Sequence, residues 1–271
     1  TEMGGLPVNS VVRLNPDGTV DTGFIAGVSD GILALALQTD GRIVGIGKYT
    51  GVDGQIRYRL VRMHPDGRHD AGFDPDLPGT LYSLAVHSDG GIFVGGRYVA
   101  DGGGTVPFLS RVLPDGRRDS AFNPAINGTV YAIAIQPDGA IVIGGTFTSV
   151  GGATRRRVAR LHADGSLDVA FQPDISTSVT MVDSVATQTD GAILTVQHVL
   201  QPTPTTKHIR RLRPDGANDA GFDAQADSWV NALALRDNGK VLVGGAFTTL
   251  QGASVTRLAQ LGGDPASQQL T

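Results

Sequence analysis

Short apolar runs alternate with polar turns along the whole chain. In most copies the first run of each set is apolar over six residues, which is typical of a strand covered on both faces. A turn containing Asp-Gly or Asn-Gly follows it, and a second apolar run comes next. The first runs lie at 32–37, 81–86, 130–135, 182–187 and 230–235, and the second at 43–49, 92–98, 141–147, 193–199 and 241–247. The pattern predicts pairs of antiparallel strands joined by tight turns.

The turns repeat at a nearly fixed interval. Their glycines are Gly41, Gly90, Gly139, Gly191 and Gly239, which lie 49, 49, 52 and 48 residues apart. A second landmark repeats in phase with them: an Arg, a following Asp-Gly turn, an Asp and a Phe. Its members are Arg13/Asp21/Phe24, Arg62/Asp70/Phe73, Arg111/Asp119/Phe122, Arg160/Asp168/Phe171 and Arg211/Asp219/Phe222. Four antiparallel strands in each repeat, around a ring, is the β-propeller pattern. A parallel β-helix would use shorter coils, and an α-solenoid would need a 3.6-residue period that is absent.

We therefore predict an all-β fold, a five-bladed β-propeller of four-stranded antiparallel blades. The first, second and fourth strands occur in five copies but the third in six, because 8–14 and 255–261 both resemble it. Ring closure is expected to pair the N-terminal strand or strands with the C-terminal blade, which hides an open edge. A longer ring, of which this chain is one part, is the alternative. The single propeller domain is expected over 8–264, with a disordered leader at 1–7 and a disordered tail at 265–271.

Composition narrows the choice of partners. The net charge is −4, which argues against nucleic acid, and the absence of cysteine excludes disulfides, thiolate metal sites and cysteine nucleophiles. No run of 18 apolar residues occurs, so no membrane insertion is predicted. The chain opens Thr1-Glu2-Met3 without a visible signal peptide, as expected of a processed protein or an excised piece.

The two landmarks resemble those of the delta-60 repeat family of bacterial β-propellers. Its units read as an apolar strand, Gln-x-Asp-Gly, a strand ending Gly-Gly-x-Phe, then Arg-Leu-x-x-Asp-Gly-x-x-Asp-x-x-Phe, as at 136–147 and 160–171 here. The similarity covers about 8–264 and weakens in the fourth unit, where 195–199 replaces the Gly-Gly-x-Phe ending. The resemblance implies a part of a large secreted or surface-exposed protein with no general enzymatic activity. It transfers no catalytic residue.

Two kinds of connection are expected on opposite sides of the disc. The near-identical Asp-Gly turns lie on one side. The connections on the other side have little in common, and they are 50–56, 100–107, 149–155, 200–207 and 249–255. Identical turns report what a blade needs to fold, whereas divergent loops on a rigid scaffold commonly carry binding. Any ligand site is therefore expected on the divergent side.

Three positions on that side break the repeat near the mouth of the central channel. Met181 and Trp229 stand in the place of Gly31, Thr80 and Thr129, and two residues further on Asp183 and Asn231 stand in the place of Leu33, Tyr82 and Tyr131. One position at the end of the second strand holds Lys48, Arg97, Thr146, His198 and Ala246. The candidate ligand-binding residues are Trp229, Asn231, Asp183, Tyr82, Tyr131, His198 and Arg97.

Each candidate also has an ordinary structural explanation. Trp229, the only Trp, is either a flat ring for stacking a sugar or part of the core. His198 with Asp183 and Asp174 could form acid–base machinery, or be a coincidence among six histidines. The paired aspartates of each Asp-Gly-x-x-Asp turn suit calcium, but bonding to the turn's own amides explains them as well. We predict no metal site, no cofactor and no catalytic residue.

Three functions follow from these observations. The leading one is a non-catalytic interaction or scaffold module of a larger secreted or surface-exposed bacterial protein, monomeric, with a protein or glycan ligand on the divergent face. The second is a lectin-like, glycan-binding propeller that uses the aromatic residues near the channel mouth. The third is a glycoside-processing enzyme, which needs two carboxylates about 5–9.5 Å apart. Asp183 is the only carboxylate placed at the channel mouth.

The second strand of the repeats ends in a recurrent glycine, at Gly47, Gly96, Gly145 and Gly245, and only Gln197 departs. Such recurrence indicates that a neighbouring backbone or aromatic ring packs where a Cβ would project, or that φ is positive there. Larger residues at this position are expected to destabilise the fold.

Overall fold

A computed structural model describes residues 2–3, 6–7, 11–26, 31–47, 49–50, 56–57, 60–75, 77, 79–97, 108–200, 206–236 and 238–262. These residues form strands and turns and no helix, so the predicted all-β class is confirmed. None of them forms a helix long and apolar enough to cross a membrane. The chain divides into two compact units, Thr1–Phe122 and Asn123–Thr271. The expectation of a single domain over 8–264 stays a prediction.

The first unit contains two sheets that follow the predicted repeat. One has the order β3 (Ile32–Leu37), β4 (Ile43–Gly47) and β7 (Leu60–Met63), and the other the order β8 (Thr80–Val86), β9 (Ile92–Arg97) and β10 (Leu109–Val112). Two-residue strands form two further hairpins, β1 (Glu2–Met3) with β2 (Leu6–Pro7) and β5 (Tyr49–Thr50) with β6 (Ile56–Arg57). The first hairpin lies in the segment expected to be a disordered leader, while the expected tail at 265–271 lies outside the described residues.

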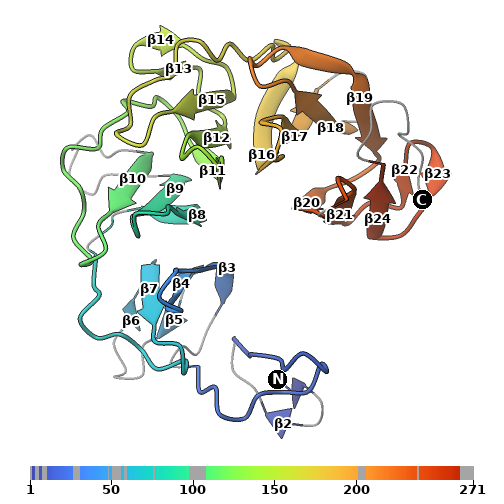
Figure 1. The fold of residues 1–271 in the computed structure, drawn as a ribbon. Coiled ribbons are helices and arrows are strands. Elements are labelled where there is room, and N and C mark those ends of the chain that lie inside the picture. Colours follow the sequence, from blue (N-terminus) through green and yellow to red (C-terminus); the bar gives the residue numbers. More distant parts are fainter. Residues whose placement is uncertain are drawn as a thin grey trace. The chain divides into compact units, whose positions relative to one another are not determined.

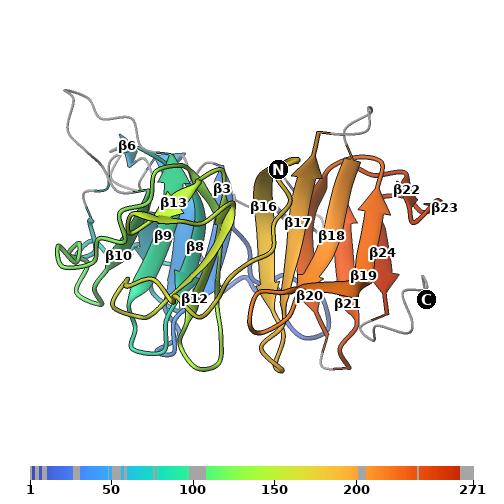
Figure 2. The same ribbon diagram turned by 90° about the horizontal axis from the view of Figure 1, so that it is seen from above.

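Besides the two-stranded sheet of β13 (Ser149–Val150) and β14 (Ala153–Thr154), the second unit contains three larger sheets (Figure 1). The outer two are β11 (Val130–Ile135), β12 (Ile141–Gly145) and β15 (Val158–Leu161), and β20 (Val230–Leu235), β21 (Val241–Gly245) and β24 (Leu258–Leu261). Between them lie β16 (Val179–Thr187), β17 (Ile193–Val199), β18 (Thr206–Leu212) and β19 (Asn218–Ala226), which Figure 2 shows as long adjacent strands. The inner strands β11, β16 and β20 are neighbours in that order. The core lies between these sheets: Val142 packs with Val182 on one side, and Val196 packs with Val243 on the other.

The predicted fourth strand is wrong for most repeats. After the third strand of each repeat the chain makes only an isolated β-bridge across the turn, at Leu14–Val20, Met63–His69, Val112–Arg118 and Leu161–Leu167. The fourth repeat is the exception, because β19 pairs with β18 over most of its length. Among the described residues, only this repeat therefore has the four regular strands expected of every blade.

The Asp-Gly turns fold as their residues predict. The Asp side chain accepts the backbone amide two residues further on, as Asp138 Oδ1 does from Ala140 at 3.0 Å. The glycine that follows it has positive φ, for example 86° at Gly139. The recurring turn carboxylates are therefore bound to their own turns, which is the structural explanation given above for the calcium-like pattern.

The second landmark forms a strut between successive repeats. The Arg Nε donates to the Asp of its own repeat at 2.7–2.8 Å, and the guanidinium lies 4.2–5.1 Å from the centroid of the Phe ring. The same guanidinium reaches the turn of the next repeat, from Arg13 to Pro65 O, from Arg62 to Pro114 O and from Arg160 to Pro214 O. Arg111 departs from the pattern, because it pairs with Asp89 and lies 3.6 Å from Asp119. The strut explains why this set of residues recurs at a fixed phase.

Candidate functional site

Every inner strand contains a β-bulge at the same place. The register shifts by one residue between Ile32 and Ala34 in β3, and the corresponding shift occurs in each of the other four inner strands. The residues left out of the ladder are Leu33, Tyr82, Tyr131, Asp183 and Asn231. A bulge re-aims the side chain of its extra residue. The position that varies between repeats is therefore the bulged one.

The recurrent glycine of the second strand lies against this bulge. A Cβ added at Gly47, Gly96, Gly145 or Gly245 would lie 2.0–2.2 Å from a carbonyl oxygen of the inner strand, far inside contact distance. None of the four has positive φ. Of the causes suggested by the sequence, the close approach of a neighbouring backbone is the main one, although Phe147 also lies 3.0 Å from the added atom at Gly145. In the repeat that carries Gln197 instead, β16 has a second register shift, between Val179 and Met181.

The fourth repeat builds a buried polar cluster beside its bulge. Asp183 (β16), His198 (β17) and Lys207 (β18) form a hydrogen-bonded chain, Asp183 Oδ2 to His198 Nε2 and His198 Nδ1 to Lys207 Nζ. Trp229, just before β20, completes the group. Its ring centroid lies 4.8 Å from that of His198, at 67°, and 4.1 Å from Lys207 Nζ. We name these four residues the Trp229 cluster.

The hydrogen bonds fix how the cluster holds its protons. The carboxylate of Asp183 accepts, so His198 carries its proton on Nε2 and presents the Nδ1 lone pair to the Lys207 ammonium. Burial lowers the pKa of Lys207, since it penalises the charged amine, while the charge of Asp183 acts in the opposite direction. The indole face receives the same ammonium as a cation–π partner. The cluster thus balances a buried cation against a buried anion.

The cluster has one exposed feature and one unpaired polar atom. Trp229 is 50% exposed although its neighbours Lys207 and His198 are buried, so part of the ring is held in place and open to water. Asp183 Oδ1 is buried and has no hydrogen-bond partner among the described residues. The exposed part of this flat ring can stack on a ring-shaped ligand. No group of three or more His, Cys, Asp or Glu side chains that could hold a metal is present in the described part.

The structure brings some of the predicted residues together and separates others. Asp183, His198 and Trp229 are in contact, as the broken repeat positions indicated. Tyr131 and Asn231 occupy the bulges of β11 and β20, the strands on either side of β16. Two candidates lie in the first unit: Tyr82 at the bulge of β8, and Arg97, exposed at the end of β9. Asp174 is not part of the cluster, and its backbone amide bonds to Gly216 O.

Sequence reasoning missed Lys207. It was placed at the end of a proline-bearing connection, whereas it is the second residue of β18. Thr206, Lys207 and His208 are all polar, so the sequence shows no alternation there that would mark an earlier strand start.

Two of the connections expected to diverge are in fact alike. The hairpin of β13 (Ser149–Val150) and β14 (Ala153–Thr154) has the same form as that of β22 (Thr249–Leu250) and β23 (Ala253–Ser254). Asn127 caps the first hairpin by accepting two backbone amides, and Asp227 caps the second in the same way. The hydroxyl of Thr248 and the amide of Thr249 hold the pKa of Asp227 down, at about 2. Divergence is therefore clearest at the bulges. The connections at 100–107 and, apart from its ends, 200–207 lie outside the described residues.

Sheets of matching topology, a 49-residue interval between turns and a repeated strut define a β-propeller repeat protein. The β-propeller family described as a domain of unknown function, DUF5122, matches residues 1–24, 38–73, 87–122, 136–171 and 237–264. These segments cover more than half of the sequence, and the chain belongs to this family, as the resemblance to delta-60 repeats predicted. The longest unmatched stretch, 172–236, contains the whole Trp229 cluster.

Solved structures with a similar fold are distant in sequence. A gluconolactonase from Xanthomonas campestris is 16% identical with a TM-score of 0.55, over 88% of this chain and 76% of that one. The extracellular domain of a protein described as a one-component system of B. thetaiotaomicron is 14% identical with a TM-score of 0.50, over 92% of this chain. This chain covers 33% of that second structure, about a third of its length. At these identities the similarity concerns the fold alone, and no curated protein matches the chain.

Proposed function

We propose that the chain is a non-catalytic interaction module of a larger secreted or surface-exposed bacterial protein. The observation that carries this proposal is the bulge. One backbone irregularity recurs in all five inner strands, yet it presents Leu, Tyr, Tyr, Asp and Asn. A constant scaffold with a variable side chain at one site is the arrangement of repeat proteins that bind partners. The location rests on the family resemblance, and a structure of similar fold is described as extracellular.

We place the five repeats in a closed ring of five blades, with N-terminal residues completing the C-terminal blade. Support comes from β3, where Leu33, Leu35 and Leu37 are exposed along one strand face. Soluble proteins seldom leave such a row in water, and closure would cover it. Deleting residues 1–24 should lower the melting temperature and increase binding of a hydrophobic dye. Unchanged melting and dye binding would contradict closure by this segment.

The interaction proposal is tested with the labelled chain and intact cells of the source bacterium, alongside its soluble cytosolic fraction. Binding to cells is expected, and it should weaken about tenfold or more in Trp229→Ala, because a central aromatic contact commonly contributes that much. Leu258→Ala, which truncates an exposed side chain on β24 away from the bulges, is the matched control. Recovery of a specific cytosolic partner without cell binding, or equal binding by both variants, would argue against the proposal.

A second candidate function is glycan binding, favoured by the half-exposed ring of Trp229 and by Asn231 at the bulge two residues further along the chain. Sugars stack on flat aromatic rings and take hydrogen bonds from planar polar groups. The bulges differ between repeats, so one site is expected rather than five. A glycan array should give a signal that Trp229→Ala abolishes. A blank array at high protein concentration would remove this candidate and leave protein partners.

We propose no catalytic role for Asp183. A glycoside hydrolase needs a second carboxylate across the sugar, and the other bulges carry Leu33, Tyr82, Tyr131 and Asn231. Asp183 Oδ2 is instead bonded to His198. Nitrophenyl glycosides should therefore be hydrolysed no faster by the wild-type chain than by Asp183→Asn. Turnover that disappears in this variant would make the chain an enzyme.

A further inference from the structure

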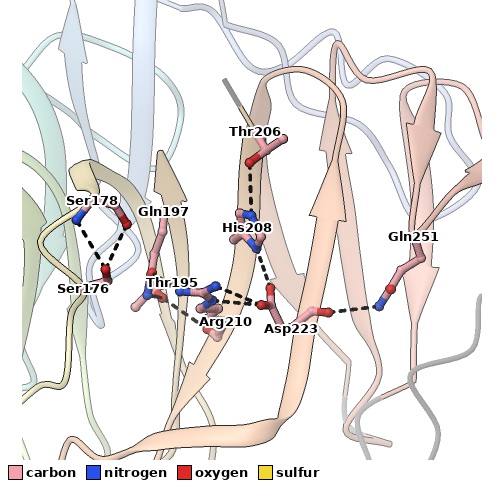
Figure 3. Close-up of polar contacts among 9 residues, drawn as sticks. All are labelled: Ser176, Ser178, Thr195, Gln197, Thr206, His208, Arg210, Asp223 and Gln251. Atoms are coloured by element: carbon pink, nitrogen blue, oxygen red, sulfur yellow. Dashed lines mark hydrogen bonds and ion pairs between the residues drawn. The ribbon is translucent and has the colours of Figure 1, made fainter. Parts of the chain in front are cut away.

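The fourth repeat carries a second polar group, whose residues lie on β17, β18 and β19 (Figure 3). Thr206, His208 and Arg210 alternate along β18, so their side chains share one face, whereas Lys207 points to the other. Asp223 of β19 pairs in register with Arg210, and Gln197 of β17 pairs with His208. The four strands of this repeat thus support two separate polar groups.

The geometry of this group is directional. Thr206 Oγ1 lies 3.1 Å from His208 Nε2, and His208 Nδ1 lies 2.7 Å from Asp223 Oδ1. Arg210 donates to the other carboxylate oxygen from Nε and Nη2, at 3.1 and 3.0 Å. Burial raises the pKa of Asp223, but the bonds from His208 and Arg210 together outweigh it and lower the pKa. The ionised carboxylate accepts the Nδ1 proton, so Nε2 presents its lone pair to the Thr206 hydroxyl.

The propeller fold does not require these residues. When the third and fourth repeats are aligned by the pairing of their strands, β12 corresponds to β17 and β15 corresponds to β18. Four replacements on one face follow, and three of them introduce a polar side chain: Ile143 by Thr195, Gly145 by Gln197 and Ala159 by Arg210; the fourth exchanges Arg157 for His208. In the third repeat Arg157 binds backbone carbonyls, including that of Phe147 at 3.3 Å. All four replacements fall in the stretch that the family match omits.

We propose that Thr206 is a base-activated hydroxyl that accepts an acyl group from an activated ester or thioester. A hydroxyl bonded to an imidazole, which a carboxylate orients, is the arrangement that makes hydroxyl side chains nucleophilic. Thr206 Oγ1 bonds to the acyl carbon, and the bond from that carbon to the leaving oxygen or sulfur breaks. His208 Nε2 carries the hydroxyl proton to the leaving group. The products are an O-acyl threonine and an alcohol or thiol, formed once per chain.

This inference goes beyond the interaction module and needs no turnover, because a stable ester would fix the chain covalently to an acyl-bearing partner. The residue Thr206 is 7% exposed, whereas the side chain of Asp223 is 42% exposed. The Thr206 hydroxyl is therefore largely covered although Asp223 is open to solvent, so small acyl donors should react first.

The test exposes the whole chain to p-nitrophenyl acetate and maps acetylated residues by peptide mass spectrometry. Two other threonines serve as internal controls, because Thr180 and Thr187 donate to backbone carbonyls, each at 3.2 Å, and not to a base. Acetylation of Thr206 is expected to exceed theirs by about tenfold or more, at the low end of general-base catalysis.

Variants of this group distinguish a Thr206 hydroxyl activated by His208 from one that reacts only because it is accessible. Thr206→Ser should keep the adduct, His208→Gln should lose most of it, and Asp223→Asn should reduce it because the imidazole then loses the tautomer that accepts at Nε2. Labelling of Thr206 no greater than that of Thr180 and Thr187 would overturn the proposal. So would labelling that His208→Gln leaves unchanged. Because the first comparison uses the wild-type chain alone, a variant that fails to fold does not remove the test.

Discussion

Two adjacent glycines of β21 allow the packing argument to be tested by a single methyl group. An alanine Cβ at Gly245 would lie 2.1 Å from Trp229 O and 2.9 Å from Val230 Cα. At Gly244 the nearest atom, Arg257 O, is 4.0 Å away. Both glycines have ordinary, negative φ, so backbone conformation does not distinguish them. Only the contact with the inner strand differs.

The magnitude follows from these distances. At Gly245 the bulge of β20 must move by about 1 Å to restore contact distance, and overpacking of this kind costs about 1–3 kcal/mol. The same movement weakens the bond from Ala246 N to Trp229 O, now 2.8 Å, which contributes about 1 kcal/mol. Gly245→Ala should therefore lower the free energy of unfolding by about 2–4 kcal/mol. Gly244→Ala should be neutral or stabilise by about 0.5 kcal/mol, because alanine restricts the unfolded chain.

Urea unfolding followed by circular dichroism measures both values. In a chain of this size the loss at Gly245 corresponds to a melting temperature about 5–15 °C lower. The fluorescence of Trp229, the only Trp, should also shift in Gly245→Ala, because the displaced carbonyl is its own. Equal losses in the two variants would refute the reasoning, since the bulge would then tolerate a Cβ and the recurrent glycine would need another cause.

Three further predictions concern charged groups. The pKa of Asp227, about 2 in the folded chain against an ordinary value of 3.8, gives stability that is complete above pH 4 and lost as the pH falls through about 2. Asp227→Asn, which copies the cap Asn127, should flatten the melting temperature between pH 4 and pH 2, and parallel curves would contradict this. Arg62→Lys should cost about 2–4 kcal/mol of unfolding free energy, because the Arg62 side chain is only 7% exposed. Arg13→Lys should cost under about 1 kcal/mol, because the Arg13 side chain is 46% exposed. Equal losses in urea melts would be evidence against the strut. Because burial lowers the pKa of Lys207, the folded state releases this proton at a lower pH than the unfolded state does. The unfolding free energy of the wild type should therefore rise relative to that of Lys207→Met as the pH approaches about 10.5. A difference between the two that does not change with pH would count against a buried cation.

The parts of the fold that could be predicted are those that local chemistry determines. Asp138 and Gly139 specify their turn through one side-chain bond and one positive φ, so the turn is readable from two residues. The bulge was visible only indirectly, as the recurrence of glycine and the variation at Asp183 and its equivalents. The absence of most fourth strands could not be predicted from the sequence. The Asp-x-x-Phe residues that suggested a strand are instead needed for the strut, in which Arg binds the Asp. Whether a strand or a bridge follows depends on longer-range pairing.

The candidate site was predicted in the same partial way. Broken repeat positions identified Asp183, His198 and Trp229, because their chemistry differs from that of the residues at the same position in the other copies. Lys207 was missed since a buried lysine has no local signal, and its partner His198 is on a different strand. Arg97 and Tyr82 were grouped with the site by position in the repeat, which does not report which unit holds them.

The strut has a consequence for how such a chain gains or loses repeats. Arg62 is held by Asp70 of its own repeat and by the turn of the next, at Pro114 O. If the chain ended between these two contacts, the Arg guanidinium would lose its acceptor in the next repeat. If a segment is deleted or duplicated between equivalent residues of two repeats, each Arg again meets an equivalent turn. The inheritable building block is therefore any window one period long, whatever its starting residue. Duplication or recombination anywhere along the gene, provided that it spans whole periods, yields a chain whose joints still fit.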